Sequence, residues 1–239
     1  MSHAAADRIR EQLLALSDSE IASRSRRFFK TGPGDYGEGN EFLGIRAPQL
    51  RRLAREHRNV PAPAAWSLLR SREHEARLLA LPMLVERFQH GTAETRDRIY
   101  ARYLREIDQR VNNWDLVDSS VREIVGAYLE PRDRRPLYAL ARSRSLWERR
   151  VAIVATHAFI KHGSYTDTFG IAEILLGDTE DLIHKATGWM LREVANRDRR
   201  STEGFLRRHY RTMPRTMLRY AIEKFPEGRR QRYLAGTIR

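Results

Sequence analysis

Apolar positions recur along the chain with the spacing of α-helices. Two segments each place their apolar residues on one helical face: Val151, Val154, Ala155 and Ala158, and Ile183, Ala186, Met190 and Val194. Alternation of apolar and polar residues, which would indicate strands, is nearly absent, and no Asn-Gly or Asp-Gly hairpin turn occurs. The pattern therefore predicts an all-α chain.

Short breaks that contain Gly or Pro divide the chain into helical segments. Helices are expected near residues 4–16, 19–30, 47–57, 62–71, 73–89, 92–106, 114–129, 133–142, 146–162, 165–176, 179–196, 199–211, 215–225 and 228–235. Pro82 should kink the helix it interrupts or end it there, because a proline inside a helix removes a backbone hydrogen bond.

Pairs of these helices recur at a common period. The sequence from His74 resembles the sequence from Trp147, which begins 73 residues later, or twice about 36. Trp114, Arg150 and Trp189 follow one another at intervals of 36 and 39 residues. Two helices in every 35–45 residues or so are typical of HEAT-like repeats, which predicts one curved α-solenoid domain over residues 1–239, with these three side chains on its concave wall. Helix pairs of similar length would also give similar spacings by chance.

The charge of the chain is strongly positive. Lys+Arg total 44 against 31 Asp+Glu, which gives a net charge of +13, and only four of the 44 are lysines. An arginine excess points to a polyanionic, phosphate-bearing partner, although a GC-rich genome would also raise the arginine content. Four Arg-rich stretches would form backbone contacts to such a partner or solvated helix faces: 24–27, 197–200, 207–211 and 229–232.

Composition and motifs exclude several classes of function. The absence of cysteine excludes disulfides, Cys-ligated zinc, iron–sulfur clusters and thiol catalysis. The Gly-rich segment 32–39 is acidic and lacks the Gly-Lys-Ser/Thr of a phosphate loop, and His74-Glu75 lacks the second histidine of a zinc protease. No metal or cofactor is expected. With no apolar stretch near the roughly 20 residues that span a bilayer, and charges close to the N-terminus, a cytoplasmic protein without a membrane partner is expected.

The most informative motif is the segment 113–118, Asn-Trp-Asp-Leu-Val-Asp. An asparagine at 112 or 113 can cap a helix, and Asp115 in the first turn complements the helix dipole, so these residues need no functional role. Asp118 lies four residues beyond Trp114 and therefore beside the indole on the same helix face. A carboxylate in that position could face a cationic group, or it could pair with an arginine.

Two further segments combine a tryptophan with basic residues. In the segment 147–150, Arg149 and Arg150 point about 100° apart on a helix, so only one of them should face the concave surface. Gly188 inside a helix is less stable than Ala by about 1 kcal/mol, which indicates a close approach by a neighbouring element. Trp189, which follows it, is offset from the apolar face of its helix, although a core position is the alternative.

Four motifs in this order resemble the AlkD-type DNA alkylation repair glycosylases, which are HEAT-like repeat proteins that excise positively charged N3- and N7-alkylated purines. The motifs lie at residues 36–48, 113–118, 147–153 and 185–193 and so span most of the chain. The resemblance implies that Asp118 is the catalytic carboxylate, that Trp114 and Trp189 are the paired site tryptophans, and that Arg150 is the active-site arginine.

The same motifs contain residues that the resemblance implies will contact DNA: Tyr36, Arg46, Lys185 and Arg192. Arg46 stands at a position where relatives differ, so it bears on lesion preference. The resemblance implies a protein that binds double-stranded DNA containing alkylated purines, associates with the nucleoid through that DNA, and keeps the lesion in the duplex instead of flipping it into a pocket. A monomer is expected, because a solenoid of this size rarely needs a partner to bury its core.

Lysine scarcity favours simple hydrolysis over lyase chemistry. A glycosylase with lyase activity needs an amine to form a Schiff base. Lys185 is the only lysine near the motif region. A monofunctional enzyme that leaves an abasic site is therefore predicted. The alternative is a noncatalytic HEAT-repeat scaffold that binds nucleic acid or protein.

Overall fold

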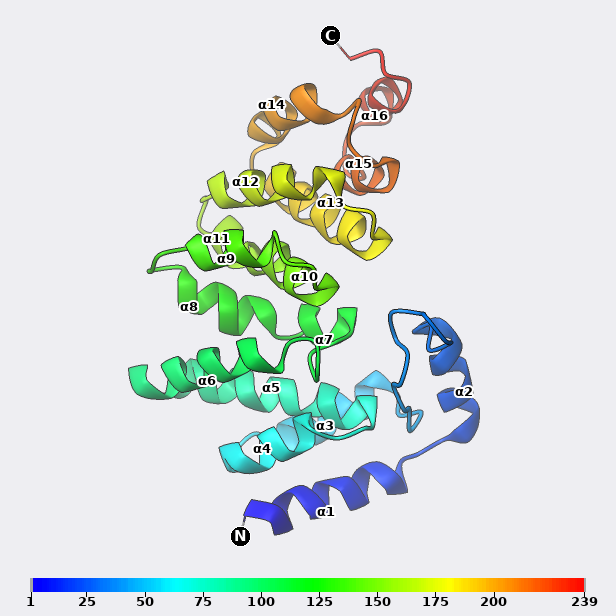
Figure 1. Ribbon diagram of the computed structural model, residues 1–239, viewed down its shortest axis with the longest axis vertical. Coiled ribbons are helices and arrows are strands. Elements are labelled where there is room, and N and C mark those ends of the chain that lie inside the picture. The colour runs from blue at the N-terminus through cyan, green and yellow to red at the C-terminus, as the bar shows by residue number, and fades with distance from the viewer. Residues whose placement is uncertain (1, 239) are drawn as a thin grey trace. The chain divides into compact units, whose positions relative to one another are not determined.

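The computed structural model describes residues 2–238, and these form helices joined by short loops (Figure 1). No β-strand occurs among those residues, where two isolated bridges join Glu41 to Glu73 and Ile107 to Val111. The all-α prediction is confirmed. Contacts divide the chain into two compact units, residues 1–124 (unit 1) and residues 125–239 (unit 2). The single domain predicted over residues 1–239 stays a prediction.

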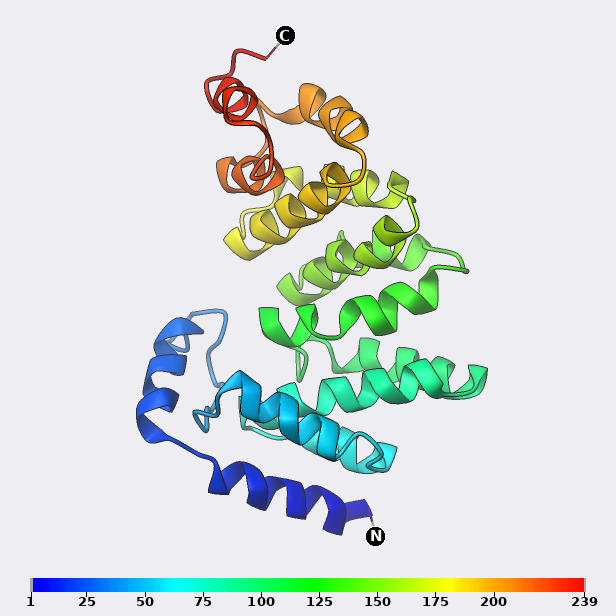
Figure 2. The same cartoon turned by 180° about the vertical axis from the view of Figure 1, so that it is seen from behind.

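Unit 1 is a stack of helices in which neighbours in sequence pack together. Its helices are α1 (Ser2–Ala15), α2 (Ser19–Phe28), α3 (Ala47–Glu56), α4 (Ala62–Leu69), α5 (His74–His90), α6 (Ala93–Glu106) and α7 (Trp114–Asp118). Helix α4 packs on α1 and α5, and α5 also packs on α3 and α6 (Figure 2). Helix α2 and the loop after it lie beside this stack, with the end of α2 toward α7.

Unit 2 continues the same kind of stacking. After a π-helical turn, Arg122–Gly126, it contains α8 (Ala127–Leu129), α9 (Arg135–Leu140), α10 (Leu146–Ala155), α11 (His157–Lys161), α12 (Thr166–Ile174), the 3-10 turn Leu175–Gly177, α13 (Asp181–Ala195), α14 (Arg199–His209), α15 (Arg215–Ala221) and α16 (Glu227–Leu234). Helix α13 is central, because α10, α12, α14 and α15 all pack against it.

The two apolar faces predicted from sequence form the core of unit 2. Their members are all buried: Val151, Val154, Ala155, Ala158, Ile183, Ala186, Met190 and Val194. Burial of such side chains is the main favourable contribution to folding. Consecutive helices that bury their faces against their sequence neighbours are the packing pattern of an α-solenoid of repeats, as the sequence predicted.

One long helix predicted at 114–129 is broken in the structure. Helix α7 ends at Asp118, and the chain resumes as the π-helical turn before α8. The hydroxyls of Ser119 and Ser120 donate to the carbonyl of Leu116 at 3.1 and 2.8 Å, respectively. Serine hydroxyls that bond to the preceding turn compete with the regular helical pattern. The break leaves Asp118 at the end of a short, separate helix.

Two other helix predictions need similar adjustment. The helix expected at 146–162 is divided at Thr156, whose hydroxyl donates to the carbonyl of Ile153 at 2.7 Å, so that α10 and α11 are separate. Pro82 lies inside α5 and does not end it, so of the two predicted effects, a kink or the end of the helix, the second does not occur. None of the helices within residues 2–238 combines the length and the apolar character needed to span a membrane.

Candidate functional site

Helix α7 carries two of the predicted site residues, Trp114 at its first position and Asp118 at its last. Asn113, which is fully buried, caps the helix: its Oδ1 accepts a hydrogen bond from the backbone N–H of Trp114 at 2.8 Å. The capping role expected for this asparagine is confirmed. Because a five-residue helix has little stability of its own, its position depends on what surrounds it.

The indole of Trp114 belongs to a cluster of aromatic rings in unit 1. It stacks on Phe29, with ring centroids 5.4 Å apart and planes at 19°, and meets Phe28 edge-on at 6.0 Å. Phe29 also stacks on Phe42, at 5.0 Å and 21°. Trp114 is only partly buried, so one part of the indole is held by the cluster and another part is open to solvent.

His74, at the start of α5, closes the cluster from the buried side. Its ring stacks on Phe42 at 4.6 Å and lies 4.9 Å from Phe29. Its Nε2 lies 2.8 Å from Oδ2 of Asp115, the residue next to Trp114, and its exposed fraction is only 2%. The structure therefore gives Asp115 a specific partner, beyond the favourable first-turn charge that the sequence indicated.

A buried polar network continues from His74 into the unit. Its Nδ1 faces Oδ1 of Asn40 at 3.5 Å, and the same oxygen accepts a hydrogen bond from the guanidinium of Arg77. Burial, and then the nearby charge of Arg110, lower the pKa of Arg77 to about 10, so the side chain still carries its charge at neutral pH. The network anchors α5 beneath the aromatic cluster.

Asp118 lies on the partly exposed side of α7, one turn from Trp114, as the four-residue spacing predicted. Its negative charge acts electrostatically on the phenol of Tyr103 in α6. Burial raises the pKa of the Tyr103 phenol, and the charge of Asp118 adds to that rise, while the phenol bonds to the hydroxyl of Ser120 at 2.8 Å. Tyr103 therefore stays a neutral phenol beneath the turn that follows Asp118.

The remaining unit 1 candidates, Tyr36 and Arg46, lie in and after the loop that follows α2. Tyr36 is half-buried, and the loop is pressed onto the end of α2, because a Cβ on the adjacent Gly37 would stand 2.3 Å from the carbonyl oxygen of Phe29. Arg46 is exposed at the N-terminus of α3. The backbone just before Arg46 is held by Glu75, whose carboxylate accepts hydrogen bonds from the N–H groups of residues 43–45 at 2.8 to 3.2 Å.

In unit 2, α13 carries the other tryptophan. Trp189 is partly exposed, off the buried face of its helix as predicted, and its Nε1 donates to Glu193 at 3.2 Å. The ring of His157 lies 5.9 Å from the indole. Gly188 meets α15 closely: a Cβ there would stand 2.5 Å from the carbonyl oxygen of Met217, so the close approach that the sequence indicated is confirmed.

The basic candidates on α13 already have carboxylate partners. Lys185 lies 2.7 Å from Asp181, and the resulting hydrogen bond lowers the pKa of that carboxyl group. Arg192 forms an ion pair with Glu223. The Lys185 pair is largely exposed and is therefore worth little, whereas the Arg192 side chain is only 19% exposed.

The two adjacent arginines of α10 are both engaged within unit 2. Arg149 bonds to Asp178 at 2.6 Å and to two backbone carbonyls. Arg150 is 4% exposed, and its Nη1 donates to the carbonyl of Leu182 on α13 at 2.6 Å. Phosphate binding by Arg150 stays a prediction, which would require the small exposed part of the side chain or a local rearrangement.

The predicted residues thus form two groups, one in each unit. Sequence reasoning missed four members of the unit 1 group, Phe28, Phe29, Phe42 and His74. The adjacent phenylalanines at the end of a basic helix were the available signal. No group of three or more metal-ligating side chains occurs in the described part of the chain.

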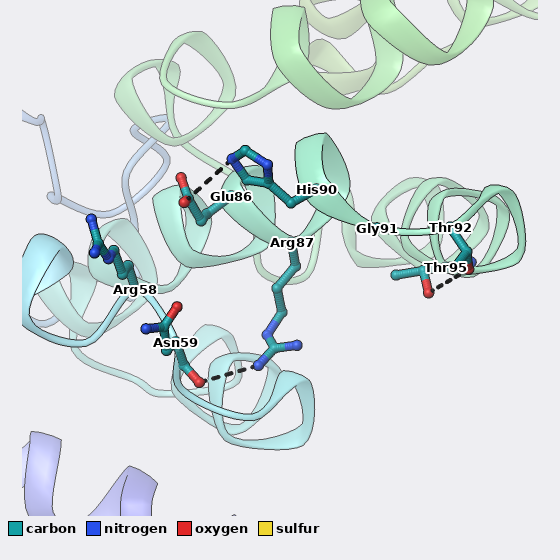
Figure 3. Close-up of a pocket in the computed structure, with 8 residues that line it drawn as sticks. All are labelled: Arg58, Asn59, Glu86, Arg87, His90, Gly91, Thr92 and Thr95. Carbon is teal, nitrogen blue, oxygen red and sulfur yellow. Dashed lines mark hydrogen bonds and ion pairs between the residues drawn. The ribbon is translucent and has the colours of Figure 1, made fainter.

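A hollow of about 670 Å³ in unit 1 holds none of the predicted residues (Figure 3). It is lined by Arg58, Asn59, Glu86, Arg87, His90, Gly91, Thr92 and Thr95. Arg87 donates to the backbone carbonyls of Asn59 and Val60, and His90 lies 3.5 Å from Glu86. Its lining carries charges of both signs, so the hollow gives no indication of a particular ligand.

Comparison with known proteins agrees with this helical fold. The family model described as DNA alkylation repair enzyme matches residues 9–225, and the chain therefore belongs to that family. A solved structure described as a predicted DNA alkylation repair enzyme from Enterococcus faecalis has a TM-score of 0.68, covering 88% of this chain and 97% of that one. At 18% identity, that likeness shows the shared fold alone. No curated protein matches the chain significantly.

Proposed function

We propose that this family member is a monofunctional DNA glycosylase that hydrolyses the N-glycosidic bond of positively charged N3- and N7-alkylated purines in duplex DNA. The observation that carries the proposal is the pairing of Trp114 and Asp118 at the two ends of α7, in a chain that belongs to a DNA alkylation repair family. The indole would contact the sugar at the lesion, and the carboxylate would act on the same sugar.

The chemistry needs only one carboxylate and a water molecule. Alkylation at N3 or N7 makes the purine cationic, so the base leaves as a neutral molecule without prior protonation, and positive charge develops on the deoxyribose. Asp118 would stabilise that charge and accept a proton from the water that attacks C1′. A charge pair at 4 Å in an effective dielectric of 20 is worth about 4 kcal/mol, or roughly a thousandfold in rate if realised only in the transition state.

The other predicted residues would bind the DNA. The open parts of the Trp114 and Trp189 rings present aromatic faces that attract cations, such as the alkylated nucleoside. Lys185, Arg192 and Arg46 would contact phosphates, the first two by exchanging their present carboxylate partners. The net charge of +13 supplies sequence-independent attraction to the duplex. A monomer without a cofactor would suffice for this reaction.

The decisive experiment is base release from methylated duplex DNA by the native chain and by Asp118→Asn. The proposal predicts release of 3-methyladenine or 7-methylguanine by the native chain and a loss of about a thousandfold in the variant. Asp97→Asn, at an exposed position of α6, is the matched control for loss of one surface carboxylate in unit 1. Failure of the native chain to release any methylated base would contradict the proposal and favour a noncatalytic nucleic-acid-binding scaffold.

A further inference from the structure

Phe28, the last residue of α2, is 66% exposed. Within the described residues, the one other strongly exposed large apolar side chain is Leu14, at 58%. Single exposed apolar residues are common on soluble proteins, so exposure alone identifies nothing. Leu14, on α1, is therefore a matched control for the removal of an exposed apolar side chain.

The ring of Phe28 is held against the candidate site. It stands edge-on to Phe29, with centroids 5.0 Å apart and planes at 90°, and edge-on to Trp114, at 6.0 Å and 72°. Because Trp114 also stacks on Phe29, the rings of Phe28, Phe29 and Trp114 form one cluster, in which Phe28 contacts both of the others. Most of the ring surface nevertheless remains open to solvent.

Three cations flank Phe28 in the sequence. Arg26 and Arg27 in the last turn of α2 are exposed, and so is Lys30, two residues after Phe28. In the loop that follows, the carboxylate of Glu38 is engaged by the backbone N–H of Gly34 at 2.9 Å. An apolar aromatic face among cations is complementary to a nucleic acid, where planar bases lie between phosphates.

We propose that Phe28 is a nucleobase contact of this chain: its ring stacks on a base face exposed at the lesion, while Arg26, Arg27 and Lys30 bind the flanking phosphates. The inference deepens the proposed function and rests on it, since the partner is the same damaged duplex. Aromatic stacking tolerates any base, because every base has a π-face. Phe28 would thus extend the Trp114 surface from the sugar to the base.

The test measures binding and base stacking without requiring base release. A duplex with a central tetrahydrofuran residue, which mimics the abasic product, carries 2-aminopurine as the neighbouring base. Affinity is measured by fluorescence anisotropy at several salt concentrations, and stacking by the 2-aminopurine emission at saturating protein. The variants are Phe28→Ala, Phe28→Trp, Arg27→Ala and the control Leu14→Ala.

Loss of a base contact and loss of a phosphate contact have different signatures. We expect Phe28→Ala to weaken binding about 5- to 150-fold with an unchanged salt slope, and to abolish the 2-aminopurine response, whereas Phe28→Trp retains both. Arg27→Ala should reduce the slope of log K against log salt by about 0.9, because one phosphate contact is lost. Leu14→Ala should behave as the native chain does.

Two results would overturn the inference. In one, Phe28→Ala binds the duplex and changes the 2-aminopurine emission as the native chain does, which would leave base release and the proposed function intact. In the other, Phe28→Ala and Leu14→Ala lose affinity equally, which would indicate a nonspecific effect of removing surface apolar groups. If the native chain releases no base, but Phe28→Ala still weakens binding and abolishes the 2-aminopurine response, only the proposed catalysis would be contradicted.

Discussion

Nε2 of His74 lies 2.8 Å from Oδ2 of Asp115, and this contact ties the start of α5 to the first turn of α7. Trp114 is therefore positioned in two ways, through the stack of rings that runs from Phe42 to Phe29 and through the hydrogen bond of its sequence neighbour. The side chains that hold the indole come from distant parts of unit 1 and converge on a helix of five residues.

Replacing His74 by Phe should destabilise the protein although it preserves a ring in the stack. The variant removes the donor to Oδ2 of Asp115, whose side chain is only 15% exposed, and an unsatisfied buried group costs about 1–3 kcal/mol. Urea unfolding measures the loss. His90→Phe, at a histidine side chain that is 74% exposed, should change the free energy of unfolding by less than about 0.5 kcal/mol. Equal effects at the two positions would refute the special role of the His74 contact.

Gly188→Ala should destabilise unit 2 even though alanine is the better helix former. The added Cβ would stand 2.5 Å from the carbonyl oxygen of Met217 and 2.5 Å from Cβ of Tyr220, so α13 and α15 would have to separate. Overpacking of this kind costs about 1–3 kcal/mol and outweighs a propensity gain of about 1 kcal/mol. The matched control is Gly204→Ala in α14, where the new Cβ meets nothing within 4 Å and stability should rise.

The cap of α14 should give stability that depends on pH. The hydroxyl of Ser201, and then its backbone N–H, lower the pKa of Asp198 from its ordinary value of 3.8. Because the folded state has the lower pKa, the contribution is complete above pH 3.8 and is lost as the pH falls through the folded value. The difference in stability between the native chain and Asp198→Ala should therefore shrink in acid. Asp198→Asn, which keeps an oxygen acceptor, should lose less at neutral pH.

Borohydride should trap no covalent adduct between the protein and abasic DNA. Lys185, the lysine nearest the matched motifs in sequence, is ion-paired with Asp181, and a protonated amine cannot form a Schiff base. Lys30 lies close to the unit 1 site, at the end of α2, so it is the second lysine to consider. A trapped adduct that disappears in Lys185→Arg or Lys30→Arg would show lyase chemistry and identify the amine responsible.

The helices were predictable because each one buries a face formed by apolar residues spaced within a single segment of sequence, such as Ile183 to Val194 on α13. The capping by Asn113 and the close approach at Gly188 were likewise local signals. The aromatic cluster was not predictable, since Phe29, Phe42 and His74 come from separate segments and only tertiary packing brings them to Trp114.

The burial of Arg150 shows the other limit of the repeat pattern. A residue that recurs at the repeat period was expected on the concave wall; in the structure its side chain is 4% exposed and its guanidinium donates to a carbonyl of α13. Arg77, the corresponding residue of the sequence that begins at His74, is also 4% exposed. Periodicity identified equivalent positions in the two repeats but could not tell a helix–helix contact from a ligand contact.

The brevity of α7 has a consequence for how variants of this chain will behave. Trp114 and Asp118 are its first and last residues, and the serine turn that follows detaches it from the next helix. Indole and carboxylate therefore move as one body, and a shift of either end displaces both. Substitutions of residues that pack against α7 should lower DNA binding and turnover together, by graded amounts. Substitutions of Trp114 or Asp118 should instead change DNA binding and turnover to different extents.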